Sequence, residues 1–296
     1  MTPRTKKSEG KVEVLGHKLF FKVFTPPSPR ATIVCLHGGP GATHDYLLPL
    51  RDLAKNGYRV VFYDQLGCGN SELPKDPALF TVERGVEELE EFRKVMKLGK
   101  IHLMGSSYGG MLALAYALKY QRNLRSIITT GGLASVPLTI AEMQRLKSEL
   151  PPGVVRTMEK YEAKGAYEDP NYEKAVMVFY KRHLLRRKKW PPEQIYTMSH
   201  VSKPVYGTMN GPNEFTIIGN MRYWDVTDQL HNIKIPTLVT GGRFDEVTPK
   251  VAKSIHDHIK GSKLVIFERS SHLGMWEERS KYMRTLDRFI RSVDAA

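Results

Sequence analysis

A serine between two glycines constrains the fold of this chain more than any other feature. In residues 100–116, KIHLMGSSYGGMLALAY, an apolar run typical of a buried strand leads into apolar residues at helical spacing. The turn between them has the sequence G-x-S-x-G, in which Gly105 and Gly109 leave room for two closely approaching backbones. The pattern predicts Ser107 as a nucleophile at the beginning of a helix, where N–H groups stabilise negative charge. Ser106 lacks glycines at the corresponding positions.

The rest of the chain alternates strands with helices. A hairpin is predicted at 11–24, and continuous apolar runs predict buried strands at 31–36, 59–63 and 101–104. Further strands are predicted at 124–129, 236–240 and 263–267. Helical spacing predicts helices at 47–55, 81–96, 251–259 and 275–293. This alternation predicts an α/β fold, with a mostly parallel sheet covered by helices on both faces.

The alternation stops between residues 134 and 231, where no clean buried strand occurs. Amphipathic helical segments are predicted there at 139–150, 153–164, 171–187 and 192–199. We therefore expect two domains. The core domain would comprise residues 1–133 and 232–296, and an inserted helical cap domain would comprise residues 134–231.

Two strand ends in the last third of the chain carry the partners that a serine nucleophile needs. Asp245 follows the predicted strand at 236–240, and His272 follows the strand at 263–267. Functional groups of parallel sheets gather beyond the carboxyl ends of strands, and Ser, Asp, His is the expected chain order. We expect His272 to take the proton of Ser107 and give it to the leaving amine, while Asp245 orients the imidazole.

Other acidic and histidine residues fit these roles less well. Asp225 and Asp228 lie at the edge of the predicted insertion rather than after a strand. His256 and His258 lie two residues apart within a predicted helix and face different ways. His102 lies within the strand before the G-x-S-x-G turn, where a buried core histidine is the simpler interpretation.

A glycine-rich loop after the first buried strand, HGGPG at residues 37–41, predicts the second half of an active site. An oxyanion hole needs two backbone N–H groups directed at one point. We expect one from Tyr108, directly after the nucleophile, and the other from Gly39. His37 is expected to brace this loop through a hydrogen bond rather than to act as a base.

The chain is strongly basic, with 45 Lys and Arg against 31 Asp and Glu and a net charge of +14. Basic and acidic residues are interleaved except near 181–189, KRHLLRRKK, which we interpret as a solvated helix face rather than a docking surface. Nucleic-acid binding is therefore not expected.

Other sequence features predict a soluble cytoplasmic protein. The two cysteines, Cys35 and Cys68, form no disulfide framework and fit a reducing compartment. The first ten residues lack the apolar segment of a signal peptide, and no run approaches the ~18 apolar residues of a membrane helix. Metal-binding and phosphate-binding motifs are also missing from the sequence, so neither a metal nor a cofactor is expected.

Five motifs together resemble the proline iminopeptidases: HGGPG, DQLGCGNS, GSSYGG, NGPNEF at 210–215 and GGRFDEVTP. These are serine peptidases of the α/β-hydrolase fold with a helical cap, and the resemblance is closest to the archaeal tricorn-interacting type. It covers nearly the whole chain. One departure is Asn70, where the family usually has arginine.

The resemblance implies release of an N-terminal residue, preferably proline, from short peptides with a free N-terminus. It also implies that Glu214 and Glu246 hold the substrate amino group, and that a larger protease complex is a possible partner. From the residues alone, Glu214 could equally be an exposed turn carboxylate and Glu246 a helix cap. Aromatic residues of the insertion, such as Tyr206, could line a proline pocket or form ordinary core.

Alternative functions remain open on sequence grounds. An amino-acid amidase or carboxylesterase could use the same scaffold, and a binding protein could use it without activity. Dehalogenase and epoxide-hydrolase chemistry is disfavoured because the turn carries serine at residue 107 rather than aspartate.

Overall fold

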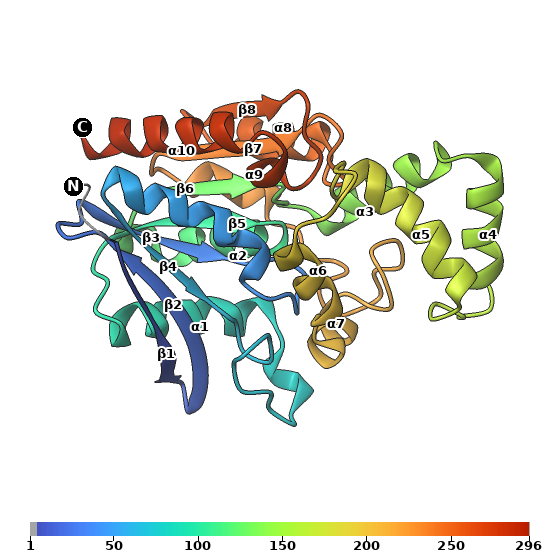
Figure 1. Cartoon of the computed structure of the whole chain (residues 1–296), viewed down its shortest axis with the longest axis horizontal. Helices are drawn as coiled ribbons and strands as arrows, with labels where there is room; N and C mark the ends of the chain where they lie inside the picture. The colour runs from blue at the N-terminus through green and yellow to red at the C-terminus, as the bar shows by residue number, and fades with distance from the viewer. Residues whose placement is uncertain (1–4, 296) are drawn as a thin grey trace.

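The computed structural model describes residues 5–295, which form one eight-stranded sheet in the order β1-β2-β4-β3-β5-β6-β7-β8 (Figure 1). The strands are β1 (Lys6–Val14), β2 (His17–Thr25), β3 (Ala31–Leu36), β4 (Tyr58–Tyr63), β5 (Ile101–Ser106), β6 (Leu124–Thr130), β7 (Thr237–Gly242) and β8 (Lys263–Phe267). Only the pairs β1–β2 and β2–β4 are antiparallel in this sheet. The predicted hairpin, the strands and the mostly parallel sheet are confirmed. The central strands β3, β4 and β5 are buried as predicted, whereas β8 lies at the edge of the sheet and is only partly buried.

Helices cover both faces of the sheet, as the sequence predicts. One face carries α1 (Val82–Val95), α2 (Tyr108–Tyr120) and α8 (Pro249–His258), and the other carries η1 (Asp45–Asn56), α9 (Gly274–Glu277) and α10 (Arg279–Asp294). Alternate residues of β3 enter the two layers, with Val34 and Leu36 in the first and Ile33 and Cys35 in the second. This two-sided burial explains why the central strands are continuous apolar runs.

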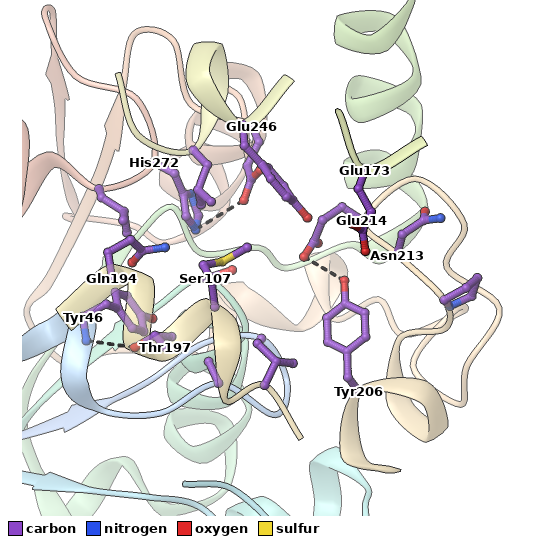
Figure 2. A pocket seen from close by; sticks show the side chains of 18 residues that line it. Tyr46, Ser107, Glu173, Gln194, Thr197, Tyr206, Asn213, Glu214, Glu246 and His272 are labelled. Atoms are coloured by element: carbon purple, nitrogen blue, oxygen red, sulfur yellow. Dashed lines mark hydrogen bonds and ion pairs between the residues drawn. The ribbon is translucent and has the colours of Figure 1, made fainter. Parts of the chain in front are cut away.

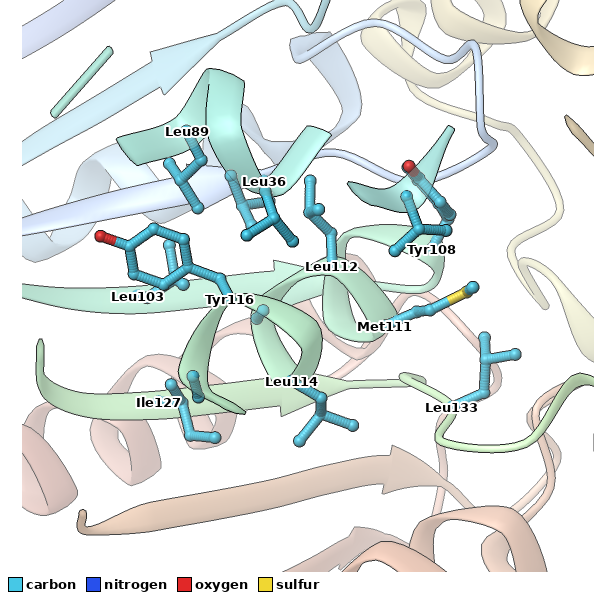
Figure 3. Packing of buried hydrophobic residues seen from close by; sticks show 14 of the residues in the cluster. Leu36, Leu89, Leu103, Tyr108, Met111, Leu112, Leu114, Tyr116, Ile127 and Leu133 are labelled. Carbon is cyan, nitrogen blue, oxygen red and sulfur yellow. The ribbon is translucent and has the colours of Figure 1, made fainter. Parts of the chain in front are cut away.

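Helix α2 is the most enclosed helix of the first layer, and it follows the serine turn directly. Its side chains Leu112 and Tyr116 pack among residues of α1, β5 and β6, including Leu89, Leu103 and Ile127 (Figure 3). Because a close-packed helix cannot shift without losing these contacts, α2 fixes the place of the turn that precedes it.

The segment between β6 and β7 is helical. It contains α3 (Val136–Ser148), α4 (Pro152–Glu162), α5 (Pro170–His183), α6 (Pro192–Ser199) and α7 (Lys203–Met209). Met158, Phe179 and Phe215 belong to an apolar cluster separate from the two sheet layers. In Figure 1, α4 and α5 lie farthest from the sheet. The division into a core and a cap at 134–231 remains a prediction, and residues 1–4 and 296 of the predicted core lie outside the described residues.

The two ends of this helical segment are joined to each other. The Val136 N–H donates to Trp224 O and the Val226 N–H donates to Ala134 O, both at 2.9 Å. The segment therefore leaves and rejoins the sheet at one place. The remaining short helices are η2 (Pro77–Leu79), η3 (Gln121–Asn123) and η4 (Thr227–Asn232). No helix within residues 5–295 is long and apolar enough to span a membrane.

Three helix predictions need correction, and one short helix was not predicted. The predicted helix at 47–55 is a 3₁₀ helix with Pro49 inside it, a residue that cannot donate to a helical ladder. The single helix expected at 275–293 is divided at Glu278, whose carboxylate accepts a hydrogen bond from Ser270 Oγ. The short helix α7 was not expected. Helix α5 ends at His183 rather than at residue 187.

The end of α5 changes the interpretation of the basic run at 181–189. Its Lys and Arg side chains are exposed, but the run is not one helix face, because the backbone leaves the helix after His183. Leu184 and Leu185 are buried, and Leu185 belongs to the apolar cluster that also contains residues of η1 and α10. Inward packing of these two leucines interrupts the helical pattern.

Candidate active site

The backbone of the serine turn explains its two glycines. Ser107 has φ 58° and ψ −125°, a strained conformation for a residue with a side chain. A Cβ atom on Gly105 would collide with the backbone of Gly109, and a Cβ atom on Gly109 would collide with Leu36 O. Ser106 is completely buried, whereas Ser107 lines a cavity. The turn thus presents Ser107 and not its neighbour.

Two backbone N–H groups lie near the serine without a protein partner. Across residues 5–295, neither the Tyr108 N–H nor the Gly39 N–H donates a hydrogen bond to another protein group. Gly39 lines the same cavity as Ser107 and has φ 110°, a value that favours glycine. The loop is held close to the serine, because the Gly38 N–H donates to Tyr46 Oη at 2.8 Å. The predicted oxyanion residues are therefore both available.

His37 braces this loop as expected. Its Nε2 atom accepts a hydrogen bond from the Gln65 N–H at 3.0 Å, and its Nδ1 atom lies 3.0 Å from Gly38 O. Burial lowers the pKa of His37, which keeps the imidazole neutral. The side chain thus connects the loop after β3 to the loop after β4.

Asp245 and His272 lie together beyond the ends of β7 and β8. His272 Nδ1 lies 2.6 Å from Asp245 Oδ1, which also accepts the Val247 N–H at 2.8 Å. The second carboxylate oxygen accepts the Gly242 N–H at 3.3 Å. These backbone bonds fix the carboxylate, and the carboxylate fixes the imidazole.

His272 and Ser107 line one cavity of about 380 Å³, a volume typical of small-ligand sites (Figure 2). No hydrogen bond joins the two side chains within residues 5–295. Bonds of this kind are often long before a substrate binds. The structure therefore brings Ser107, Asp245 and His272 to one place.

Glu246 and Glu214 approach this cavity from different elements. Glu246 is 4% exposed, and its Oε1 atom lies 3.8 Å from His272 Nε2. Its Oε2 atom is buried without a hydrogen-bond partner. Glu214 is partly buried in the turn after α7 and accepts a hydrogen bond from Tyr206 Oη at 2.7 Å. Both carboxylates line the cavity, so Glu246 does not serve as a simple helix cap.

The charges of the cavity shift one another's pKa values. Burial alone would lower the pKa of His272, but Asp245, Glu246 and Glu214 outweigh it and raise the pKa to about 9. Burial raises the pKa of Glu246 to about 8, against the opposing effect of the His272 imidazolium. Burial also raises the pKa of Glu214, although the Tyr206 hydroxyl and His272 oppose that shift. Burial therefore disfavours the ionised form of both carboxyl groups, and a cation bound beside them would favour it.

The rival residues have other partners. Asp225 accepts a hydrogen bond from Ser135 Oγ at the junction of the helical segment. His256 bonds to Ser262 Oγ, and His258 bonds to Ser254 O on helix α8. His102 is buried and bonds to Ser126 Oγ, as a core histidine would. None of these four residues lines the cavity.

Comparison with known proteins places this arrangement in a family. Residues 31–279 match the family model for the alpha/beta hydrolase fold. The chain is 50% identical over 287 residues to the proline iminopeptidase of Saccharolobus solfataricus, covering 96% of this chain and 93% of that protein. It is 51% identical to the proline iminopeptidase of Thermoplasma volcanium, covering 95% of this chain and 96% of that protein.

The chain belongs to the proline iminopeptidase family of α/β hydrolases. Among solved structures, the proline iminopeptidase of Mycobacterium smegmatis has a TM-score of 0.91 and 31% identity, covering 97% of this chain and 99% of that chain. The structure of VinJ has a TM-score of 0.93 and 36% identity, with the same two coverages.

One departure from the usual proline iminopeptidase sequence has a local structural role here. The Asn70 N–H donates to Asp64 Oδ2 at 2.9 Å, and the Asn70 amide lies 3.4 Å from the same oxygen. The other Asp64 oxygen binds the backbone N–H and ring of His44. Asn70 therefore closes a buried polar cluster in the loop after β4, away from the cavity lining.

Several cavity residues were not assigned individually from the sequence. Tyr46, Gln194 and Thr197 line the cavity, and Thr197 Oγ1 bonds to Thr43 Oγ1 at 3.0 Å across 154 positions of the chain. Tyr206 was only one of several aromatic candidates. The hydrogen bond from its hydroxyl to Glu214 could not be inferred from the spacing of the two residues in the sequence. Glu214 lies within the NGPNEF motif that carries the family resemblance, and Tyr206 lies just before it. Within residues 5–295 no cluster of three His, Cys, Asp or Glu is arranged to hold a metal ion.

Proposed function

We propose that this chain is a serine aminopeptidase that releases an N-terminal residue, preferably proline, from short peptides. One observation carries the proposal: Ser107, His272 and two carboxylates, Glu214 and Glu246, line one cavity. A hydrolase that does not require a free amino group in its substrate needs only Ser107, His272 and Asp245. The extra carboxylates give the cavity the charge that a protonated N-terminus requires.

Glu246 is the stronger candidate for the amino-group contact. A buried carboxylate oxygen without a partner costs free energy, and an ammonium group of the substrate would supply the missing hydrogen bond. Glu214 is already oriented by Tyr206 and would accept a second bond from the same ammonium group. Charge-assisted bonds of this kind contribute about 1.5–3 kcal/mol each. Together they would fix the distance from the N-terminus to the cleaved bond at one residue.

The chemical steps follow from the geometry. Ser107 Oγ attacks the carbonyl carbon while His272 accepts the hydroxyl proton, and the Gly39 and Tyr108 N–H groups stabilise the oxyanion. His272 then protonates the leaving amine, the C–N bond breaks, and a prolyl ester of Ser107 remains. A water molecule, deprotonated by His272, hydrolyses this ester. Asp245 holds the imidazole throughout and stabilises its cation.

The carboxylates proposed to bind the substrate ammonium group also affect the pKa of the proposed base, His272. In the free site, nearby carboxylates favour the His272 imidazolium, which cannot accept a proton. An incoming ammonium would neutralise Glu246 and Glu214, so it would lower the pKa of His272 toward the value a base needs. An uncharged acyl compound would leave the imidazolium in place.

An amino-acid amidase or carboxylesterase is the alternative on this scaffold, and it is not favoured. The close relatives are named proline iminopeptidases, and this chain matches them over nearly their full length. A buried acidic group beside the nucleophile would also give no advantage on a neutral ester.

A panel of substrates tests the proposal with the unmodified protein. We expect prolyl anilide to be hydrolysed fastest, followed by alanyl and phenylalanyl anilides, with little action on an amino-blocked ester at neutral pH. Fastest hydrolysis of the blocked ester would instead assign the protein as an esterase.

Location and partners form the last part of the proposal. A cytoplasmic site is supported by two free, buried cysteines, Cys35 and Cys68. Association with a larger protease complex, which the tricorn-interacting resemblance implies, would be tested by co-purification from the native cell.

A further inference from the structure

The cavity has two different ends on either side of Ser107. Figure 2 shows Glu214, Asn213 and Tyr206 on one side of the serine and Gln194, Tyr46 and Thr197 on the other. If the acidic end holds the N-terminus, as the proposed function requires, the remainder of the peptide must extend toward the neutral end. The residues there would contact the leaving peptide.

Two of the polar residues at the neutral end are already engaged. Thr197 Oγ1 bonds to Thr43 Oγ1 and accepts the Tyr46 N–H at 3.3 Å. Tyr46 Oη accepts the Gly38 N–H and so supports the glycine loop. These contacts fasten helix α6 to η1 and to the loop after β3. Both residues therefore already make contacts that hold the wall of the cavity together.

Gln194 differs from both. It lies on α6 with 3% of its surface exposed, and its Oε1 atom is buried without a hydrogen-bond partner. Its side chain lines the cavity beside the catalytic residues (Figure 2). A buried amide oxygen without a partner is unfavourable in the empty site, and a ligand that donates an N–H would satisfy it.

We propose that Gln194 binds the first peptide group beyond the cleaved bond and so selects peptides over other leaving groups. Its Oε1 atom accepts the N–H of that group, and its Nε2 atom donates to the carbonyl, since a side-chain amide and a peptide group are complementary. This role rests on the proposed function and concerns a specificity-determining residue, not a member of the chemical machinery.

The test compares two substrates that form the same prolyl ester of Ser107. Prolyl-glycyl-glycinamide has a peptide group beyond the cleaved bond, and prolyl anilide has none. Gln194→Met keeps the length of the side chain but removes its amide. We expect kcat/KM for the tripeptide amide to fall about tenfold, or about 1.4 kcal/mol. The anilide should change less than twofold.

Gln229→Met is the matched control, because it makes the same chemical change at an exposed position on η4. It should alter neither substrate, and thermal melting should show that both variants fold. Equal losses on the two substrates, or no loss on either, would overturn the role of Gln194. Failure of the unmodified protein to cleave both substrates would instead count against the proposed function.

A second readout uses the acyl-enzyme directly. When prolyl anilide is hydrolysed with added glycylglycinamide, the prolyl group divides between water and this acceptor. Gln194→Met should lower the share transferred to glycylglycinamide, because the acceptor must occupy the same site as the leaving peptide. An unchanged division would contradict the proposal, because a purely structural role of Gln194 predicts that the division stays the same.

Discussion

The sheet side and the helical side of the cavity differ in how their residues are held. On the sheet side, Ser107, Asp245 and His272 lie in loops that follow β5, β7 and β8, and backbone N–H groups hold the Asp245 carboxylate that orients His272. On the helical side, Glu214 and Gln194 belong to elements between β6 and β7. The comparison teaches that one side can supply the chemistry while the other restricts the substrate.

The two sides are nevertheless tied through one carbonyl group. His183 O, at the end of α5, accepts the His272 N–H at 3.0 Å and the Glu246 N–H at 3.2 Å. The helical segment thus contacts the backbone of both loops that carry the proposed acid, Asp245, and the proposed base, His272. A change on the helical side can therefore affect the sheet side through position as well as charge.

The largest effect is expected when the proposed nucleophile on the sheet side is removed. Ser107→Ala should reduce kcat by about 10,000-fold or more on anilides and esters alike, because the nucleophile serves every acyl substrate. Binding of a free-amine product such as proline should persist, since the carboxylates are untouched. Single-turnover kinetics and calorimetric titration of proline measure the two quantities. Residual activity near the original level would assign the nucleophile elsewhere.

The sequence predicted that the three residues of the sheet side lie together, because the signals for their positions are local. Ser107 is identified by glycines two positions away on each side, and Asp245 and His272 are identified by the strands that precede them. Each of these positions is determined within about ten residues of chain. Parallel strands then bring the three ends to one edge of the sheet.

The helical side was predicted less completely for a physical reason. Glu214 came from the family resemblance, and Gln194 was not identified at all. Gln194 reaches the cavity because α6 packs on η1, a contact between segments about 150 residues apart that leaves no periodic pattern in either one. The early end of α5 was missed because it depends on tertiary contacts: Leu184 and Leu185 are buried after the backbone has left the helix at His183.

A smaller effect is expected when Glu214 on the helical side is changed, and it should depend on whether the substrate has a free amino group. Glu214→Gln should lower kcat/KM for prolyl anilide by roughly 10- to 150-fold, which corresponds to one charge-assisted bond to the ammonium. An amino-blocked ester should change little. Glu173→Gln is the control, because Glu173 lines the same end of the cavity but is exposed, so water screens its charge. Equal losses of activity on the ester and the anilide would mean that Glu214 does not contact the amino group of the substrate.

The smallest effect concerns Glu246, which follows β7 on the sheet side but faces the substrate with Glu214. Its carboxylate helps to raise the pKa of His272 to about 9, so Glu246→Gln should lower that pKa. The base must be neutral to act, so activity rises with pH through this pKa. For an amino-blocked ester, the rising limb of kcat/KM should therefore move to lower pH by about one unit, which is tenfold in proton concentration.

This shift has an unusual consequence, because a variant that loses activity on prolyl anilide should gain it on the ester at pH 7. The gain arises only if Glu246 acts on the imidazole through charge as well as on the ammonium of the substrate. pH–rate profiles of the unmodified protein, Glu246→Gln and Glu173→Gln would measure it. A limb that stays in place or moves to higher pH would mean that Glu246 does not set the charge of His272, and the two sides of the cavity would then act independently.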